Sequence, residues 1–270
     1  MTEKTIVVLE TAAEQCSAEI YLNRVPVALV GGAWGKTLMG AAVPEHLIDG
    51  ENELAILVNP GKTPSQALTG RRMMRAPGAT AYARLVRYPV GAYSGDPRGQ
   101  QLVRLDFAAN TEGKEELFPM LGRRRFAMDV KWHKWRWLDA PRLTLDDATR
   151  TEVWKLLAAV HRALDRRDTG AVAEMCRIWC EECNLAHDVT PGRKALDLEL
   201  NLDAVVNDPD SPLDNLREED FDLRLVGEGR MIDCVARDWN PILRTVPDNG
   251  EMSYLSLMVA RIDGRMQIVR

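Results

Sequence analysis

The chain lacks long apolar segments. No apolar run reaches the roughly 18 residues that a membrane-spanning helix needs. The N-terminal segment has acidic residues near its start and no long apolar core, so it does not have the pattern of a secretory signal. These absences predict a cytoplasmic protein without a membrane partner.

The sequence also has few of the residues that build common reaction centres. It contains 4 histidines and 5 cysteines among 270 residues. An odd number of cysteines without a secretory signal argues against a disulfide framework. Neither a Ser/His/Asp order nor an HExxH spacing is present, so we expect each histidine to be structural. We therefore predict no cofactor and no recognisable active site, and we favour a protein that is not an enzyme.

Charge is distributed unevenly along the chain. Residues 1–138 carry 18 Lys and Arg against 14 Asp and Glu, whereas residues 139–270 carry 17 against 26. The segment 197–222 alone holds 10 acidic residues and 1 basic residue. This polarity predicts that the two halves dock on each other or that the protein forms a head-to-tail homodimer. The modest excess of positive charge argues against a nucleic-acid partner.

The first half has the pattern of short strands. Apolar runs alternate with clusters of Gly, Pro and Asn, which is typical of an antiparallel β-sandwich. The runs are Thr5–Leu9, Ala18–Leu22, Val25–Val30, Leu54–Val58, Ala81–Tyr88, Leu102–Phe107 and Phe126–Trp132.

Within this half, EIYLNRVPV and AAVPEHLIDGENELAILVNPG resemble the jelly-roll sandwich modules attached to many carbohydrate-active enzymes. The residues that carry the resemblance are Asn23, Gly50, Asn52, Leu54, Ile56 and Val58. Asp49-Gly50 supplies a turn, and the alternating apolar residues after it supply a strand. The resemblance implies a sandwich fold and, as one alternative function, carbohydrate binding.

The second half begins with helical patterns. Thr144 and Asp147 predict a capping box, and an apolar face then recurs from Val153 to Leu164. A second helix is predicted after Asp168, with Cys176, Cys180 and Cys183 on one face. Residues 187–220 stay open, because alternating leucines favour a strand whereas the Leu, Ala and Glu content favours a helix.

From Phe221 onward the pattern predicts an antiparallel meander, with a hairpin turn at Asp263-Gly264. Helices followed by such a meander resemble the nuclear-transport-factor-like or cystatin-like α+β superfamily. The closing residues Arg261, Asp263, Gly264, Met266, Ile268 and Arg270 carry this resemblance, with Met266 in place of the usual aromatic residue. The resemblance implies a cone-shaped domain with a concave sheet.

Two motifs suggest chemistry that we do not favour. Val30–Thr37 nearly spells a phosphate-binding loop, but Val30 stands where that motif needs glycine. Cys176, Cys180 and Cys183 have a spacing that resembles iron–sulfur radical enzymes, and His187 offers a fourth ligand for zinc. Because the cysteines share an apolar helical face, we predict that they pack in the core and bind no metal.

Two groups of residues are candidates for binding. Trp132, Trp135 and Trp137 lie among basic residues and have the composition of a base-stacking surface, but we favour an edge or interdomain strand in which the Trp side chains are buried. Asp220 and Asp222 lie at the start of the predicted meander. A catalytic role is assigned to none of them.

The sequence therefore predicts an α+β protein of two domains. An N-terminal antiparallel β-sandwich spans residues 1–138, and a cystatin-like cone with helices and a curved antiparallel sheet spans 143–270. The leading hypothesis is a cytoplasmic binding protein that recognises a protein partner, such as a bacterial toxin-immunity or secretion-accessory protein. The alternatives are a small-molecule hydrolase or isomerase with a pocket in the cone, and a carbohydrate-binding module.

Overall fold

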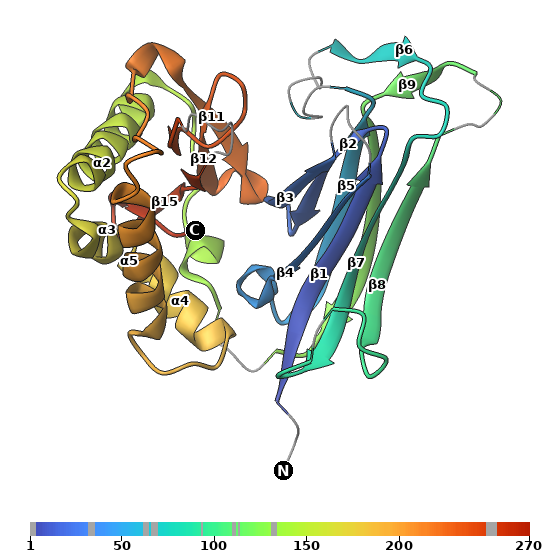
Figure 1. The fold of residues 1–270 in the computed structure, drawn as a ribbon, viewed down its shortest axis with the longest axis horizontal. Coiled ribbons are helices and arrows are strands. Elements are labelled where there is room, and N and C mark those ends of the chain that lie inside the picture. Colours follow the sequence, from blue (N-terminus) through green and yellow to red (C-terminus); the bar gives the residue numbers. More distant parts are fainter. Residues whose placement is uncertain are drawn as a thin grey trace. The chain divides into compact units, whose positions relative to one another are not determined.

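The structure is a computed structural model that describes residues 4–31, 36–61, 65, 70–92, 94–109, 112, 114–130, 134–246 and 253–270. The chain divides into two compact units, residues 1–132 and 133–270. The first unit is built mainly from antiparallel strands and the second combines α-helices with antiparallel strands, so the protein is mixed α+β (Figure 1). No helix in the described ranges is long and apolar enough to cross a membrane.

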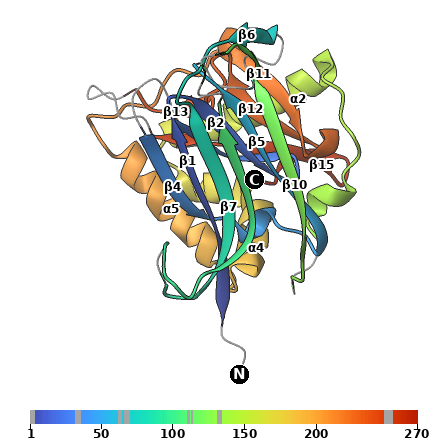
Figure 2. The ribbon, with the colours of Figure 1, turned by 90° about the vertical axis from the view of Figure 1, so that its right-hand side faces the viewer.

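The first unit is built from two four-stranded antiparallel sheets. The first sheet has the order β4-β1-β7-β8, and Figure 2 shows β4, β1 and β7 side by side. Its strands are β1 (Thr5–Glu14), β4 (Lys36–Ala42), β7 (Thr80–Pro89) and β8 (Gln100–Ala108). The second sheet has the order β10-β5-β2-β3. Its strands are β2 (Ser17–Leu22), β3 (Val25–Gly31), β5 (Gly50–Asn59) and β10 (Met120–Met128). A small additional sheet pairs β6 (Arg72–Met74) with β9 (Glu116–Phe118).

Alternation of side chains along the strands builds the core of this unit. Val7, Leu9 and Ala13 of β1 point inward and are buried with Ile20 and Ile56 from the second sheet. Neighbouring positions on β1 point to the opposite face, where Glu10 lies. The first sheet therefore presents one apolar face to the core and one face that carries charge.

Asn23 and Asn52, which carry the jelly-roll resemblance, stabilise a turn through hydrogen bonds. Asn23 has a positive φ of 52°, and its Nδ2 donates hydrogen bonds to the Asn52 side chain and to the His46 carbonyl, both at 2.9 Å. Asn52 is buried and bonds in turn to the backbone of Ile48. These buried side-chain amides provide hydrogen-bond partners for backbone groups of the loop before β5, so their role is structural.

The second unit begins with a run of helices. They are α2 (Asp147–Asp165), α3 (Thr169–Met175), α4 (Arg177–Ala186) and α5 (Arg193–Val206). The N-cap of α2 is Asp146, whose side chain accepts a hydrogen bond from the Thr149 amide at 2.8 Å. The predicted capping box at Thr144 was therefore misplaced by two residues. Thr144 instead donates its hydroxyl to Asp146.

The segment 187–220, for which the sequence left strand and helix open, contains helix α5. The helix begins after Gly192, which has a φ of 84°. The alternating leucines do not share one face: Leu202 is buried, whereas Leu196 and Leu200 are exposed. The period of two is thus accidental here, and helical propensity decides the structure.

The second unit ends in a four-stranded meander of order β11-β12-β15-β16. Its strands are β11 (Phe221–Val226), β12 (Met231–Ala236), β15 (Met258–Ile262) and β16 (Arg265–Ile268). A two-stranded sheet, β13 (Leu243–Arg244) with β14 (Tyr254–Leu255), is inserted between β12 and β15. The predicted turn at Asp263-Gly264 is confirmed, because both residues have positive φ, as a type I′ hairpin requires.

Both faces of the meander are covered. On one face, Val153 and Leu157 of α2 share a buried cluster with Ile232, Val259 and Ile268 of the strands. On the other face lies η3 (Arg136–Asp139), which contacts β15. Trp137 of η3 packs against Gly227, where an added Cβ would lie 3.1 Å from its ring. The sheet is therefore the middle layer of this unit.

A buried ion pair ties the start of this unit to its last strand. The Arg270 guanidinium donates to the Glu182 carboxylate, and both side chains are almost fully buried. The second oxygen of Glu182 accepts the Arg136 amide at 2.8 Å, and the Arg270 guanidinium lies 5.3 Å from the centre of the Trp135 ring. Glu182 thus holds α4, η3 and the end of the chain together.

Removing the cation of this pair should destabilise the protein. Replacing Arg270 by Met leaves the Glu182 charge buried without compensation, and the expected loss of unfolding free energy is about 3–5 kcal/mol. The measurement is urea unfolding followed by tryptophan fluorescence. Arg177→Met, which removes an exposed guanidinium from the Glu181 pair, is the matched control and should change stability little. Equal stability of the two variants would contradict this role for Arg270.

Candidate functional site

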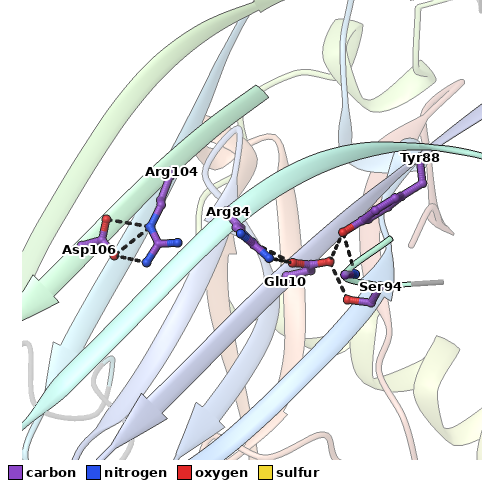
Figure 3. A network of polar contacts seen from close by, with 7 residues as sticks. Glu10, Arg84, Tyr88, Ser94, Arg104 and Asp106 are labelled. Atoms are coloured by element: carbon purple, nitrogen blue, oxygen red, sulfur yellow. Dashed lines mark hydrogen bonds and ion pairs between the residues drawn. The ribbon is translucent and has the colours of Figure 1, made fainter. Parts of the chain in front are cut away.

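The most extensive polar cluster of the first unit lies on the outward face of its first sheet (Figure 3). Strand register places Glu10 of β1 opposite Arg84 of β7, and Arg84 opposite Arg104 of β8. The next row across the same face places Tyr82 opposite Asp106. Charged side chains from three strands therefore meet on one surface.

Glu10 is the centre of this cluster. Its carboxylate accepts hydrogen bonds from Arg84 Nε at 2.7 Å, from Tyr88 Oη and from Ser94 Oγ, and its side chain is only 6% exposed. Burial acts to raise the pKa of Glu10, but the bonds from Ser94, Tyr88 and Arg84 outweigh it, so the pKa lies below its usual value. Tyr88 itself accepts the Gly95 amide at 2.8 Å. Glu10 therefore fastens the loop after β7 to the sheet.

A second ion pair lies beside the first. Arg104 donates from Nε and from a terminal nitrogen to Asp106, at distances between 2.6 and 2.9 Å. Hydrogen bonds from Arg104 keep the pKa of Asp106 below its usual value, against a smaller effect of burial. The same guanidinium lies 4.8 Å from the centre of the Tyr82 ring. One face of the only aromatic ring in this row is thus already occupied by a cation.

This arrangement favours a structural role for the cluster over a catalytic one. Each carboxylate of the cluster is bound by an arginine, which keeps it ionised and engaged. A general acid or base instead needs a pKa near the working pH and access to a substrate. Among the described residues of this face, Tyr82 is covered by Arg104 and is therefore not the free aromatic platform typical of sugar recognition.

The stabilising role of Glu10 predicts a specific pH dependence. Glu10→Gln should lower the unfolding free energy by roughly 2–3 kcal/mol near neutral pH, since charge-assisted hydrogen bonds are lost. Because the pKa of Glu10 is lowered in the folded state, this difference is present above the unfolded pKa and disappears as pH falls through the folded pKa. Urea unfolding of both proteins across the acid range measures it. A difference independent of pH would show that the charge of Glu10 is not responsible.

The tryptophans predicted as a binding surface lie mainly inside the second unit. Trp135 and Trp137 are 1% and 2% exposed, whereas Trp132 lies outside the described residues, as does His133. The predicted alternation of burial is present, but residues 136–139 form a 3-10 helix where a strand was expected. The Nε1 atom of Trp137 is buried without a hydrogen-bond partner in the described structure. The two described rings therefore serve as packing residues.

The cysteines are buried and resist ionisation. Burial raises the pKa of Cys176 to about 12 and that of Cys180 to about 11. Cys183 is buried on the same side of α4, and His187 caps the end of that helix. Among the described residues, no group of three or more His, Cys, Asp or Glu side chains is placed to hold a metal ion. With such pKa values, Cys176 and Cys180 stay protonated near neutral pH and are poor nucleophiles.

The segment Val30–Thr37, which nearly matches a phosphate-binding loop, lies at the connection between two strands. Residues 32–35 are outside the described ranges, but β3 ends at Gly31 and β4 begins at Lys36. A phosphate-binding loop requires a helix whose N-terminus faces the phosphates. A strand follows here, so the surroundings of this motif are those of a sheet connection.

Asp220 lies in an exposed acidic segment of the second unit, and Asp222 lies just after it. Asp220 ends η4 (Glu218–Asp220) and is exposed, whereas Asp222 is partly buried and accepts the Leu223 amide at 2.8 Å. Five exposed residues define what we call the acidic surface. They are Asp208, Asp210, Glu218, Glu219 and Asp220. Within the described ranges, none of these carboxylates forms an ion pair.

An open crevice borders the first part of this surface. It lies between α5 and the β13–β14 sheet and contains about 340 Å³ of space, counted out to its mouth. Apolar side chains form most of its wall, and Arg244, Thr245, Ser253 and Tyr254 also line it. The apolar set includes Leu164, Leu202, Val206, Leu213, Leu243 and Leu255. The sequence showed Leu164 and Leu202 only as members of apolar patterns, because the crevice forms where α5, Leu213 and the β13–β14 sheet meet in the fold.

Comparisons with protein-family models, with characterised proteins and with solved structures give no match for this chain. The interpretation of both units therefore rests on their residues and geometry.

Proposed function

We propose that this chain is a binding protein, not an enzyme, and that it recognises a protein partner through the acidic surface of its second unit. The observation that carries the proposal is that Asp208, Asp210, Glu218, Glu219 and Asp220 are exposed without an ion pair in the described structure. Surface charge of one sign steers association with a partner of the opposite sign. The partner is therefore expected to present a basic surface.

The buried charges support binding over catalysis. Glu10 is bonded to Arg84, Glu182 to Arg270, and Asp233 to Arg224 at 2.6 Å. These carboxylates are committed to arginines within their own unit. A catalytic carboxylate would instead need to face a substrate-sized space with an altered proton affinity.

We infer that the second unit is a separate domain of the nuclear-transport-factor-like or cystatin-like type, whose helices and meander form a cone. The order of helices before an antiparallel meander supports this assignment. Enzymes of this type need space between the helices and the sheet, whereas Val153, Leu157, Cys176 and Ile232 fill that region here. A hydrolase or isomerase with a pocket in the cone is therefore the less favoured alternative.

The first unit is inferred to be a separate jelly-roll-like domain. A carbohydrate-binding role would need a free aromatic face, and Arg104 occupies one face of Tyr82. A bacterial immunity protein that neutralises a basic toxin, or an accessory protein of a secretion system, fits the proposed binding function better. If the partner is a second copy of this chain, the proposed binding is self-association through surfaces of opposite charge.

Charge reversal tests the proposal. A variant with Glu218, Glu219 and Asp220 all changed to Lys should bind the partner isolated from source cells at least about tenfold more weakly, because attraction becomes repulsion. The control reverses the same number of exposed charges in the first unit, at Glu51, Glu112 and Glu115. It should retain binding. Affinity is measured by calorimetry at low and high salt.

The wild-type affinity should fall as salt is added, since exposed charges are screened. If the second-unit variant binds as tightly as the wild type, the acidic surface is not the recognition site. Turnover of a small molecule that Glu10→Gln or Asp233→Asn abolishes, while the fold persists, would replace the binding function by an enzymatic one.

A further inference from the structure

The crevice beside α5 has the construction of an anchor pocket. Its floor is buried and apolar, with Leu164, Leu202 and Leu243 exposed by 4%, 8% and 1%. Its rim carries Tyr254, which is 65% exposed. Tyrosine is enriched among the residues that contribute most to protein–protein affinity, and such residues meet well-packed pockets of the partner.

We propose that this crevice binds one bulky apolar side chain, Phe or Leu, of a partner segment that carries Lys or Arg on both sides of it. The inference rests on the proposed function and names the feature by which the partner would be recognised. The crevice is small and open, and its 340 Å³ includes space that is open to solvent, so it suits a single side chain better than a larger ligand.

The charge around the crevice argues for basic flanking residues. The loop that joins the lining residues Val206 and Leu213 carries Asp208 and Asp210, which are exposed and without an ion pair in the described structure. This loop is held against β13, since Ser211 Oγ donates to Thr245 Oγ1 at 3.0 Å. The two exposed acids therefore lie in a loop whose two ends line the crevice.

The one cation in the lining does not oppose such a partner. Arg244 Nε lies 3.2 Å from Asp214 Oδ2, and a terminal nitrogen of Arg244 lies 2.9 Å from Asp238 Oδ2. Its charge is thus balanced within the unit by two carboxylates. The net field at the mouth is set by the loop acids, which attract Lys and Arg.

The test uses the full chain and three synthetic probes. The first is acetyl-Lys-Lys-Phe-Lys-Lys-amide, the second has Ala in place of Phe, and the third has Glu in place of every Lys. Affinities come from NMR titration with labelled methyl groups. The Phe probe should bind about tenfold more tightly than the Ala probe, because it buries a large apolar side chain. The methyl signals that shift should be those of Leu202, Leu213 and Leu255.

Variants assign the effect to the crevice. Val206→Trp fills the mouth from α5 and should remove the preference for Phe over Ala. Ala204→Trp adds the same side chain at an exposed position of α5 outside the lining and should preserve the preference. Thermal unfolding of both variants establishes that each is folded before its affinities are compared.

The outcomes separate this inference from the proposed function. Equal affinity for the Phe and Ala probes, both lost on Asp208→Lys with Asp210→Lys, overturns the anchor pocket but leaves acidic recognition intact. Equal affinity for the Lys and Glu probes overturns the basic flanks. A wild-type dimer in sedimentation that Val206→Trp dissociates would show that a second copy occupies the crevice, and would also overturn the inference.

Discussion

The constraint on which this structure depends is that a charge buried in the interior needs an opposite charge beside it. Three ion pairs meet this requirement, and each joins segments that are far apart in the sequence or that lie on neighbouring strands. They are Glu10 with Arg84, Glu182 with Arg270, and Asp233 with Arg224. An unpaired buried charge costs several kcal/mol, which is comparable with the whole stability of a domain. These pairs therefore fix the geometry around them.

The same pairing explains where reactivity is absent and where binding is favoured. Arginines inside each unit engage the buried carboxylates and keep them ionised. In the second unit, the segment 197–222 has only Arg217 to balance its acids, so several carboxylates stay exposed without a partner. The interior is therefore committed to stability, and the exposed acidic surface is where a basic partner would bind.

Much of the fold could be predicted from local patterns. Apolar runs located β1, β2, β3, β5, β7 and β8, and the Asp263-Gly264 turn was assigned correctly. Strands β4, β6 and β9 were missed, because Lys36 and Gly40 interrupt the apolar pattern of β4 and because β6 and β9 have only 3 residues each. For α5, the alternating leucines favoured a strand and the Leu, Ala and Glu content favoured a helix, and helical propensity decides the structure.

The candidate sites were less predictable, because long-range register assembles them. No local motif places Glu10 beside Arg84, Tyr88 and Ser94, which lie more than 70 positions later. The acidic segment was visible as composition, but the crevice beside it requires α5, Leu213 and Leu255 to meet. Trp135 and Trp137, which composition singled out, became packing residues because η3 lies against the sheet.

The central claim is that the acidic surface and the crevice of the second unit form the recognition site. Hydrogen–deuterium exchange of the full chain, free and bound to its isolated partner, tests it most directly. The account predicts that slowed exchange is concentrated in residues 202–220 and 243–246, with the outward face of the first sheet unchanged. Protection centred instead on β1, β7 and β8 around Glu10 would contradict it.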